Sequence, residues 1–205
     1  VGDAAAFIDP FYSPGMDWIT YTTHRARDLI LGQLNGEDVA RLVMLHNSDF
    51  TNSYHRWFNA LYKDKYQYFG DYELMRVAFL LDLGLYYFGV VRHPYQCGTM
   101  HLSYASFSKR RALPAFYLMS FYNRRLAKIA QVRRVRGMLG EKNDNHRFLF
   151  GGYTFAANSL RHLFKAFANW IWLEVTEGWR SWGAAGSNPM KPLPSAETAS
   201  PVAKT

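Results

Sequence analysis

The residues best suited to bind a ligand lie in one short run, Gly2–Asp17, with the sequence GDAAAFIDPFYSPGMD. Its first residues, up to Ala6, are mostly small, and such a sequence is typical of the end of a buried strand. The Asp3 carboxylate would then lie at the end of that strand. Such a carboxylate can accept hydrogen bonds from sugar or polyol hydroxyls. Pro10 and Ser13-Pro14-Gly15 then predict a turn and a helix start, because Ser13 can cap the helix and proline is favoured at the first helical position. The free N–H groups of that helix end can hold an anion or a polarised carbonyl.

A flavin nucleotide offers both features, since its ribityl hydroxyls lie close to the N1–C2=O edge of its ring. The run resembles the second FAD-binding motif of the flavin-dependent monooxygenases of the p-hydroxybenzoate hydroxylase fold, G-D-A-A-x(5)-P-x(4)-G, with four residues in place of five between Ala5 and Pro10. It resembles more closely the variant found in flavin-dependent halogenases and their relatives, G-D-A-x-x-F-x-D/E-P-x-x-S-x-G. The matching positions are Gly2, Asp3, Ala4, Phe7, Asp9, Pro10, Ser13 and Gly15.

This resemblance implies specific roles for several residues. Asp3 would bond the ribityl chain of FAD, Pro10 would shape the turn beside the isoalloxazine ring, and the amides of three residues at the helix start would face its pyrimidine edge. The cofactor-binding residues predicted on this basis are Gly2, Asp3, Pro10, Ser13, Gly15, Met16 and Asp17. In the family, reduced FAD and O₂ form a flavin hydroperoxide that hydroxylates a small-molecule substrate or oxidises halide, with electrons from a flavin reductase or NAD(P)H. No catalytic residue is predicted.

Other parts of the family's pattern are absent from the sequence. The dinucleotide-binding G-x-G-x-x-G, the tryptophan-containing halogenase motif and its lysine are missing, and all lie upstream in the family. Val1-Gly2-Asp3 has no methionine start, so we expect a fragment that neither retains FAD nor is active by itself. Halogenases typically carry Thr or Ser where this chain has Pro14, which has no amide hydrogen for a halide. The sequence therefore favours monooxygenation over halogenation.

The remaining sequence predicts helices that would position this motif. Hydrophobic periodicity indicates helices over 14–34, 37–63, 71–91, 113–136 and 153–180. The predicted fold class is mainly α: the C-terminal helical portion of an α/β FAD-binding oxidoreductase, with one residual strand-turn-helix of the FAD domain at the start. We expect residues 1–35 to end the FAD-binding domain, 36–182 to form a helical substrate-side domain, and the Ala/Ser/Pro/Lys-rich residues 183–205 to be a disordered tail.

The charge pattern leaves a second function open. The 205 residues are 49% hydrophobic, enough for a packed core, and carry a net charge of +8. No acidic residue occurs from Leu83 to Gly140, which favours an anionic partner and a non-enzymatic, basic, all-α interaction protein as the alternative. The cations between Arg124 and Arg136 spread around their helix, so no nucleic-acid site is predicted. We interpret them as a solvated helix end that complements the helix dipole.

Asp82 and the aromatic residues around it need partners. An isolated carboxylate in an apolar helix is costly, so Asp82 is expected to find an arginine or a hydroxyl. Twelve aromatic residues lie between Tyr54 and Phe88. They could form the floor of a substrate pocket, but we favour packing in the helical core.

No metal site, membrane span or disulfide is predicted. His93, Cys97 and His101 lack the second ligand pair that zinc sites use. The longest apolar stretch, Val77–Val91, is interrupted by Asp82 and suits a buried helix better than a membrane span. The lone cysteine and the lack of a secretory signal favour a cytoplasmic protein.

Overall fold

The described part of the chain is entirely helical. The computed structural model describes residues 6–12, 14–92, 107–108, 110–143 and 159–182, and none of these residues lies in a strand. The α-helices within them are α1 (Pro14–Leu34), α2 (Ala40–Trp57), α3 (Tyr72–Tyr86), α5 (Leu113–Val135) and α6 (Ser159–Thr176). The mainly α fold predicted from the sequence is therefore confirmed.

The predicted helix boundaries agree closely with the structure. The prediction over 14–34 matches α1, which ends two residues before Gly36, whose backbone has a positive φ of 79°. The predictions over 37–63 and 71–91 include α2 and α3 with the π-helical turns that continue them, Phe58–Tyr62 and Tyr87–Val91. The predicted strand at residues 1–6, the Ser13 cap and the tail at 183–205 fall wholly or largely outside the described residues.

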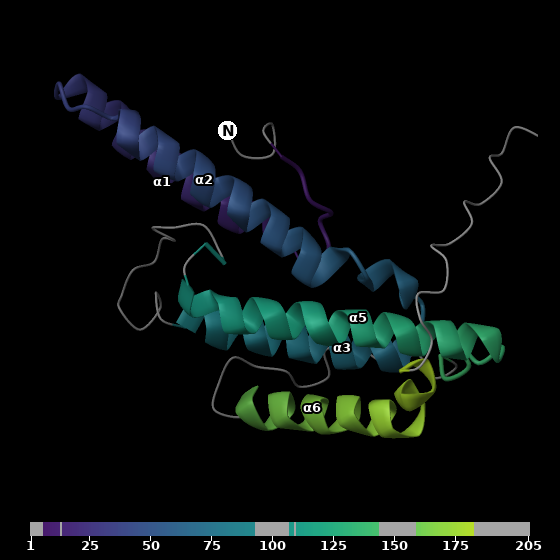
Figure 1. Cartoon of the computed structure of the whole chain (residues 1–205). Helices are drawn as coiled ribbons and strands as arrows, with labels where there is room; N and C mark the ends of the chain where they lie inside the picture. Colours follow the sequence, from purple (N-terminus) through teal and green to yellow (C-terminus); the bar gives the residue numbers. More distant parts are fainter. Residues whose placement is uncertain (1–5, 13, 93–106, 109, 144–158, 183–205) are drawn as a thin grey trace, which may run out of the picture.

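The helices form a hairpin and a three-helix body. Figure 1 shows α1 and α2 side by side, running away from the body that α3, α5 and α6 build. At the free end of this hairpin, large apolar side chains such as Ile30 and Leu34 are exposed. At its base, Trp18 and Trp57 are buried and belong to the same core as the body.

The body is held by close apolar packing between α3, α5 and α6. Leu81 on α3 and Met119 and Leu126 on α5 are fully buried. Gly84 on α3 lies against Leu163 on α6, and a Cβ at Gly84 would come within 2.7 Å of Leu163 Cδ1. The absence of a side chain at Gly84 therefore allows α6 to approach α3.

An arginine-centred cluster joins the ends of the three helices. The Asp71 side chain caps α3 by accepting the Leu74 amide, and Arg133 of α5 donates to both Asp71 oxygens at 3.0 Å. Arg133 also donates to Glu73 and Glu177. The interpretation of Arg133 as part of a solvated helix end is wrong, because three carboxylates surround it and bury it.

Candidate functional site

The predicted site begins with a tight turn before α1. Asp9 Oδ1 accepts the Phe11 amide at 2.8 Å, which closes the turn locally. Tyr12 has a φ of 72°, in the left-handed region that bulky side chains rarely adopt. Pro10 lies in this turn and is exposed. Residues 9–12 are called the motif turn below.

The start of α1 has backbone donors that the helix itself does not satisfy. The first N–H groups of an α-helix have no carbonyl partner within the helix, and in α1 these include the amides of Gly15 and Met16. Met16 is 66% exposed, so its position at the helix end is accessible. The donors and the positive end of the helix dipole fit a polarised carbonyl edge such as that of a flavin.

The Asp17 carboxyl group contacts the body of the molecule at α3. The Tyr86 hydroxyl of α3 donates to Asp17 Oδ2. Burial raises the pKa of the Asp17 carboxyl above its ordinary value, and the bond from Tyr86 opposes this shift. As the fourth helical residue, Asp17 is also the first whose amide can bond a carbonyl four residues earlier, so its amide is less suited to a ligand than those of Gly15 and Met16.

The structure thus brings together four of the predicted cofactor-binding residues. Pro10, Gly15, Met16 and Asp17 lie in the motif turn and the first turn of α1. The predictions for Gly2, Asp3 and Ser13 fall outside the described residues.

Tyrosines that follow in the sequence hold the motif turn and the segment before it against the helices. The Tyr62 hydroxyl donates to the Phe11 carbonyl, and the Tyr66 hydroxyl donates to the Asp9 carboxylate. Tyr54 on α2 also donates to the Phe7 carbonyl at 3.4 Å. Part of the aromatic-rich region therefore supplies hydroxyl donors to the backbone and side chains of the motif.

A buried polar network lies directly behind the motif turn. Its centre is an ion pair between Lys65 and Asp82, whose side chains are 1% and 2% exposed. Tyr12 donates to Asp82 Oδ2 at 2.7 Å, while Tyr122 and Asn123 of α5 donate to Asp82 Oδ1. The prediction that Asp82 finds a hydroxyl partner is confirmed, and its cationic partner is a lysine.

Asn123 completes this network from α5. Its side-chain oxygen accepts from Lys65 Nζ at 3.2 Å and from the Tyr68 hydroxyl, and its amide nitrogen donates to the Ala60 carbonyl at 2.8 Å. The motif turn, the segment after α2, α3 and α5 therefore all meet at one fully buried point.

Burial fixes the protonation states of the network's tyrosines. It acts with the Asp82 carboxylate to raise the pKa values of Tyr12, Tyr68 and Tyr122 well above their ordinary range. Burial also lowers the pKa of the Lys65 ammonium, and Asp82 opposes that shift. The tyrosines thus remain neutral hydrogen-bond donors at neutral pH, a role suited to holding the turn.

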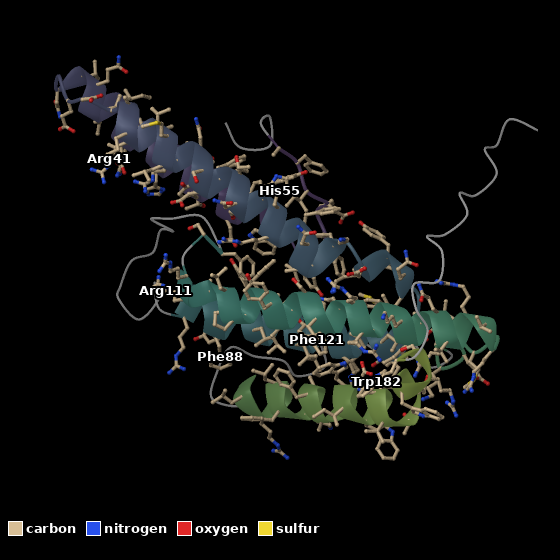
Figure 2. All side chains as sticks on the ribbon, in the orientation of Figure 1. Arg41, His55, Phe88, Arg111, Phe121 and Trp182 are labelled. Carbon is tan, nitrogen blue, oxygen red and sulfur yellow. The ribbon has the colours of Figure 1, made fainter. Side chains whose placement is uncertain are left out.

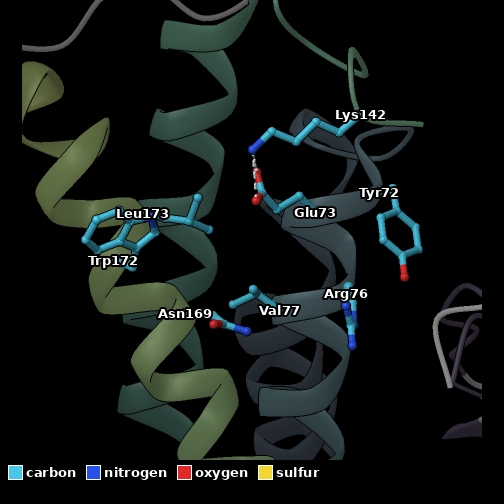
Figure 3. A pocket seen from close by; sticks show the side chains of 8 residues that line it. All are labelled: Tyr72, Glu73, Arg76, Val77, Lys142, Asn169, Trp172 and Leu173. Atoms are coloured by element: carbon cyan, nitrogen blue, oxygen red, sulfur yellow. Dashed lines mark hydrogen bonds and ion pairs between the residues drawn. The ribbon is translucent and has the colours of Figure 1, made fainter. Parts of the chain in front are cut away.

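The surface pockets of the described residues lie elsewhere, and we consider here the pair that α6 lines. One, between α3 and α6, has a volume of about 140 Å³ and contains the ion pair of Glu73 with Lys142 (Figure 3). It is smaller than the roughly 300–1,000 Å³ typical of small-molecule sites. Phe121 and Trp182, labelled in Figure 2, line the other pocket of about 480 Å³, where Arg125 and Glu174 already bond each other. That pocket offers mainly aromatic surface.

The described residues contain neither a membrane-spanning helix nor a metal-binding cluster. None of the helices there has the length and apolar character that crossing a bilayer requires. No group of three or more His, Cys, Asp or Glu side chains in these ranges is arranged to hold a metal ion. The predictions for His93, Cys97 and His101 fall outside the described residues.

Comparison with protein-family models, with curated proteins and with solved structures gave no match.

Proposed function

We propose that this chain is the carboxyl-terminal part of an FAD-dependent oxidoreductase of the monooxygenase and halogenase class. The observation that carries the proposal is that the sequence G-D-A-x-x-F-x-D-P-x-x-S-x-G leads directly into a helix, α1, whose first amides have no carbonyl partner within the helix. The Gly15 and Met16 amides at this helix start support the proposal, because the resemblance assigns the flavin-facing donors to these residues.

The protein's own groups bind and orient the cofactor. Gly15 and Met16 would donate to the pyrimidine edge of the flavin, and Asp3 would accept from the ribityl hydroxyls. FAD, when bound, supplies the redox chemistry with O₂. The motif turn, held by Tyr62 and Tyr66, keeps the helix start in place for this contact.

Pro14 favours monooxygenation over halogenation. It is the first residue of α1 and has no amide hydrogen, so the helix start has one donor fewer for a halide. Losing one hydrogen bond to an anion costs about 1.5–3 kcal/mol, or roughly ten- to a hundredfold in affinity. The substrate would be a small organic molecule, with a flavin reductase or NAD(P)H as the electron source.

The test uses the complete protein encoded by the gene that contains this sequence. We expect it to bind FAD in a fluorescence titration, and we expect Asp3→Ala to weaken binding by roughly ten- to a hundredfold, because it removes charge-assisted hydrogen bonds. Gln33→Ala, an exposed change in α1, serves as the control and should leave the affinity unchanged.

A product assay then separates the two reactions. The reduced enzyme receives O₂, bromide and a panel of phenols and indoles. Hydroxylated products without bromination are expected, and efficient bromination at millimolar bromide would overturn the preference. A complete protein that binds no FAD would refute the oxidoreductase proposal and favour the basic interaction protein.

A further inference from the structure

Tyr12 joins the motif turn to the buried ion pair. Its backbone belongs to the turn that leads into α1, and its hydroxyl donates to Asp82 Oδ2 at 2.7 Å. Lys65 Nζ lies 3.3 Å from the same hydroxyl and 5.2 Å from the centre of the Tyr12 ring. No other residue of the motif turn bonds this ion pair in the part of the chain that the structure describes.

The backbone of Tyr12 requires such an attachment. A left-handed φ of 72° is unfavourable for a tyrosine and persists only where surrounding contacts hold it. The ring is packed between Phe11 and Phe79, with centroid distances of 4.3 and 5.2 Å. The hydroxyl bond to Asp82 fixes the far end of the same side chain, so ring packing and hydrogen bonding together determine the conformation of the turn.

We propose that Tyr12 is a positioning residue for the flavin, acting through the Lys65–Asp82 pair. The bond to Asp82 fixes the motif turn and hence the direction in which the Gly15 and Met16 amides point. This inference rests on the proposed function, because it concerns the same cofactor. Tyr12 itself faces the buried network, so it acts without touching the ring system that it positions.

Tyr122 provides a matched control. It also donates its hydroxyl to Asp82, through the other carboxylate oxygen, and it is fully buried whereas Tyr12 is partly buried. However, it lies on α5 and has no covalent connection to the motif turn. Tyr12→Phe and Tyr122→Phe each remove one hydroxyl hydrogen bond to the same carboxylate. Only the first of these two tyrosines belongs to the motif turn.

The experiment compares both variants in the complete protein. Tyr12→Phe is expected to weaken FAD binding by about tenfold and Tyr122→Phe by less than about twofold, although both lower the urea concentration at half-unfolding. The flavin midpoint potential should become more negative only in Tyr12→Phe, because misaligned amides stabilise the charge of the reduced ring less well. A purely structural role for Tyr12 would leave this potential unchanged.

Two other outcomes would overturn the positioning role of Tyr12. Equal changes in affinity and potential for the two variants would overturn the positioning role while leaving the flavin site intact. A wild-type complete protein that binds no FAD would overturn the proposed function and this inference with it. Should Tyr12→Phe not fold, Tyr62→Phe tests whether the motif turn positions the flavin, since its hydroxyl bonds the Phe11 carbonyl in that turn. An unchanged FAD affinity and potential in Tyr62→Phe would then overturn the positioning role.

Discussion

Replacing Lys65 by methionine tests the buried network most severely. The substitution keeps most of the side-chain volume and removes the cation beside Asp82. The Asp82 carboxylate, 2% exposed, would keep hydrogen bonds from Tyr12, Tyr122 and Asn123 but lose its counter-charge. Breaking one side of a buried ion pair costs about 3–5 kcal/mol. Because single domains are stable by only about 5–15 kcal/mol, Lys65→Met should remove a large part of the free energy of unfolding.

The assay is equilibrium urea unfolding followed by far-UV circular dichroism, and the control is Lys63→Met. Lys63 is exposed and lies two residues away, so its replacement should change the stability by less than about 0.5 kcal/mol. Adding Asp82→Asn to Lys65→Met should restore at least about 1 kcal/mol, because the amide keeps an acceptor for the tyrosines without a buried charge. Equal stabilities of Lys65→Met and Lys63→Met, or further destabilisation of the Lys65→Met protein by Asp82→Asn, would refute a stabilising role for the buried ion pair.

Other predictions concern the arginine-centred cluster and the helix packing. Arg133→Met should lower the free energy of unfolding by about 3–5 kcal/mol in the same urea assay, since it leaves buried Asp71 without its cation; a loss below about 1 kcal/mol would contradict this. Burial acts to raise the pKa of the Glu73 carboxyl, but hydrogen bonds from Lys142 and Arg133 outweigh it and hold the pKa below its ordinary value. The ionised carboxyl therefore stabilises the fold at neutral pH, and this contribution is lost as the pH falls through the lowered pKa. Glu73→Gln should therefore cost about 1 kcal/mol at pH 7 and progressively less as the pH falls through that lowered pKa, and a pH-independent difference in urea midpoints would argue against it. Gly84→Ala should lower the melting temperature, because its Cβ would clash with Leu163, and should reduce the free energy of unfolding by about 1–3 kcal/mol. Leu163→Ala should destabilise the Gly84→Ala protein less than it destabilises the wild type. Strictly additive effects of the two substitutions would show that the residues do not contact each other.

Local signals in the sequence account for the helices. The start of α1 at Pro14 and its end at Asn35-Gly36 were predictable from local signals. Proline restricts the backbone and glycine permits a positive φ, and both effects are independent of the tertiary fold. The need of Asp82 for a partner was predictable for a similar reason, since a carboxylate on an apolar helix face must be satisfied.

The partners themselves depend on tertiary contacts. Lys63 and Lys65 flank Asp64 in the same polar and aromatic context, yet Lys63 is exposed and Lys65 fully buried. Arg133 likewise resembles exposed Arg134 until the ends of α3 and α6 place carboxylates around it. Periodicity alone does not separate such neighbours, because it describes one helix and not what packs against it.

A crystal structure of the complete protein with FAD would test whether the start of α1 holds a flavin. The N1–C2=O edge of the ring is predicted to lie about 3 Å from the amide nitrogen of Gly15 or Met16, with the ribityl chain beside Asp3. A flavin bound away from this helix start, or a complete protein that crystallises from excess FAD without it, would contradict the account.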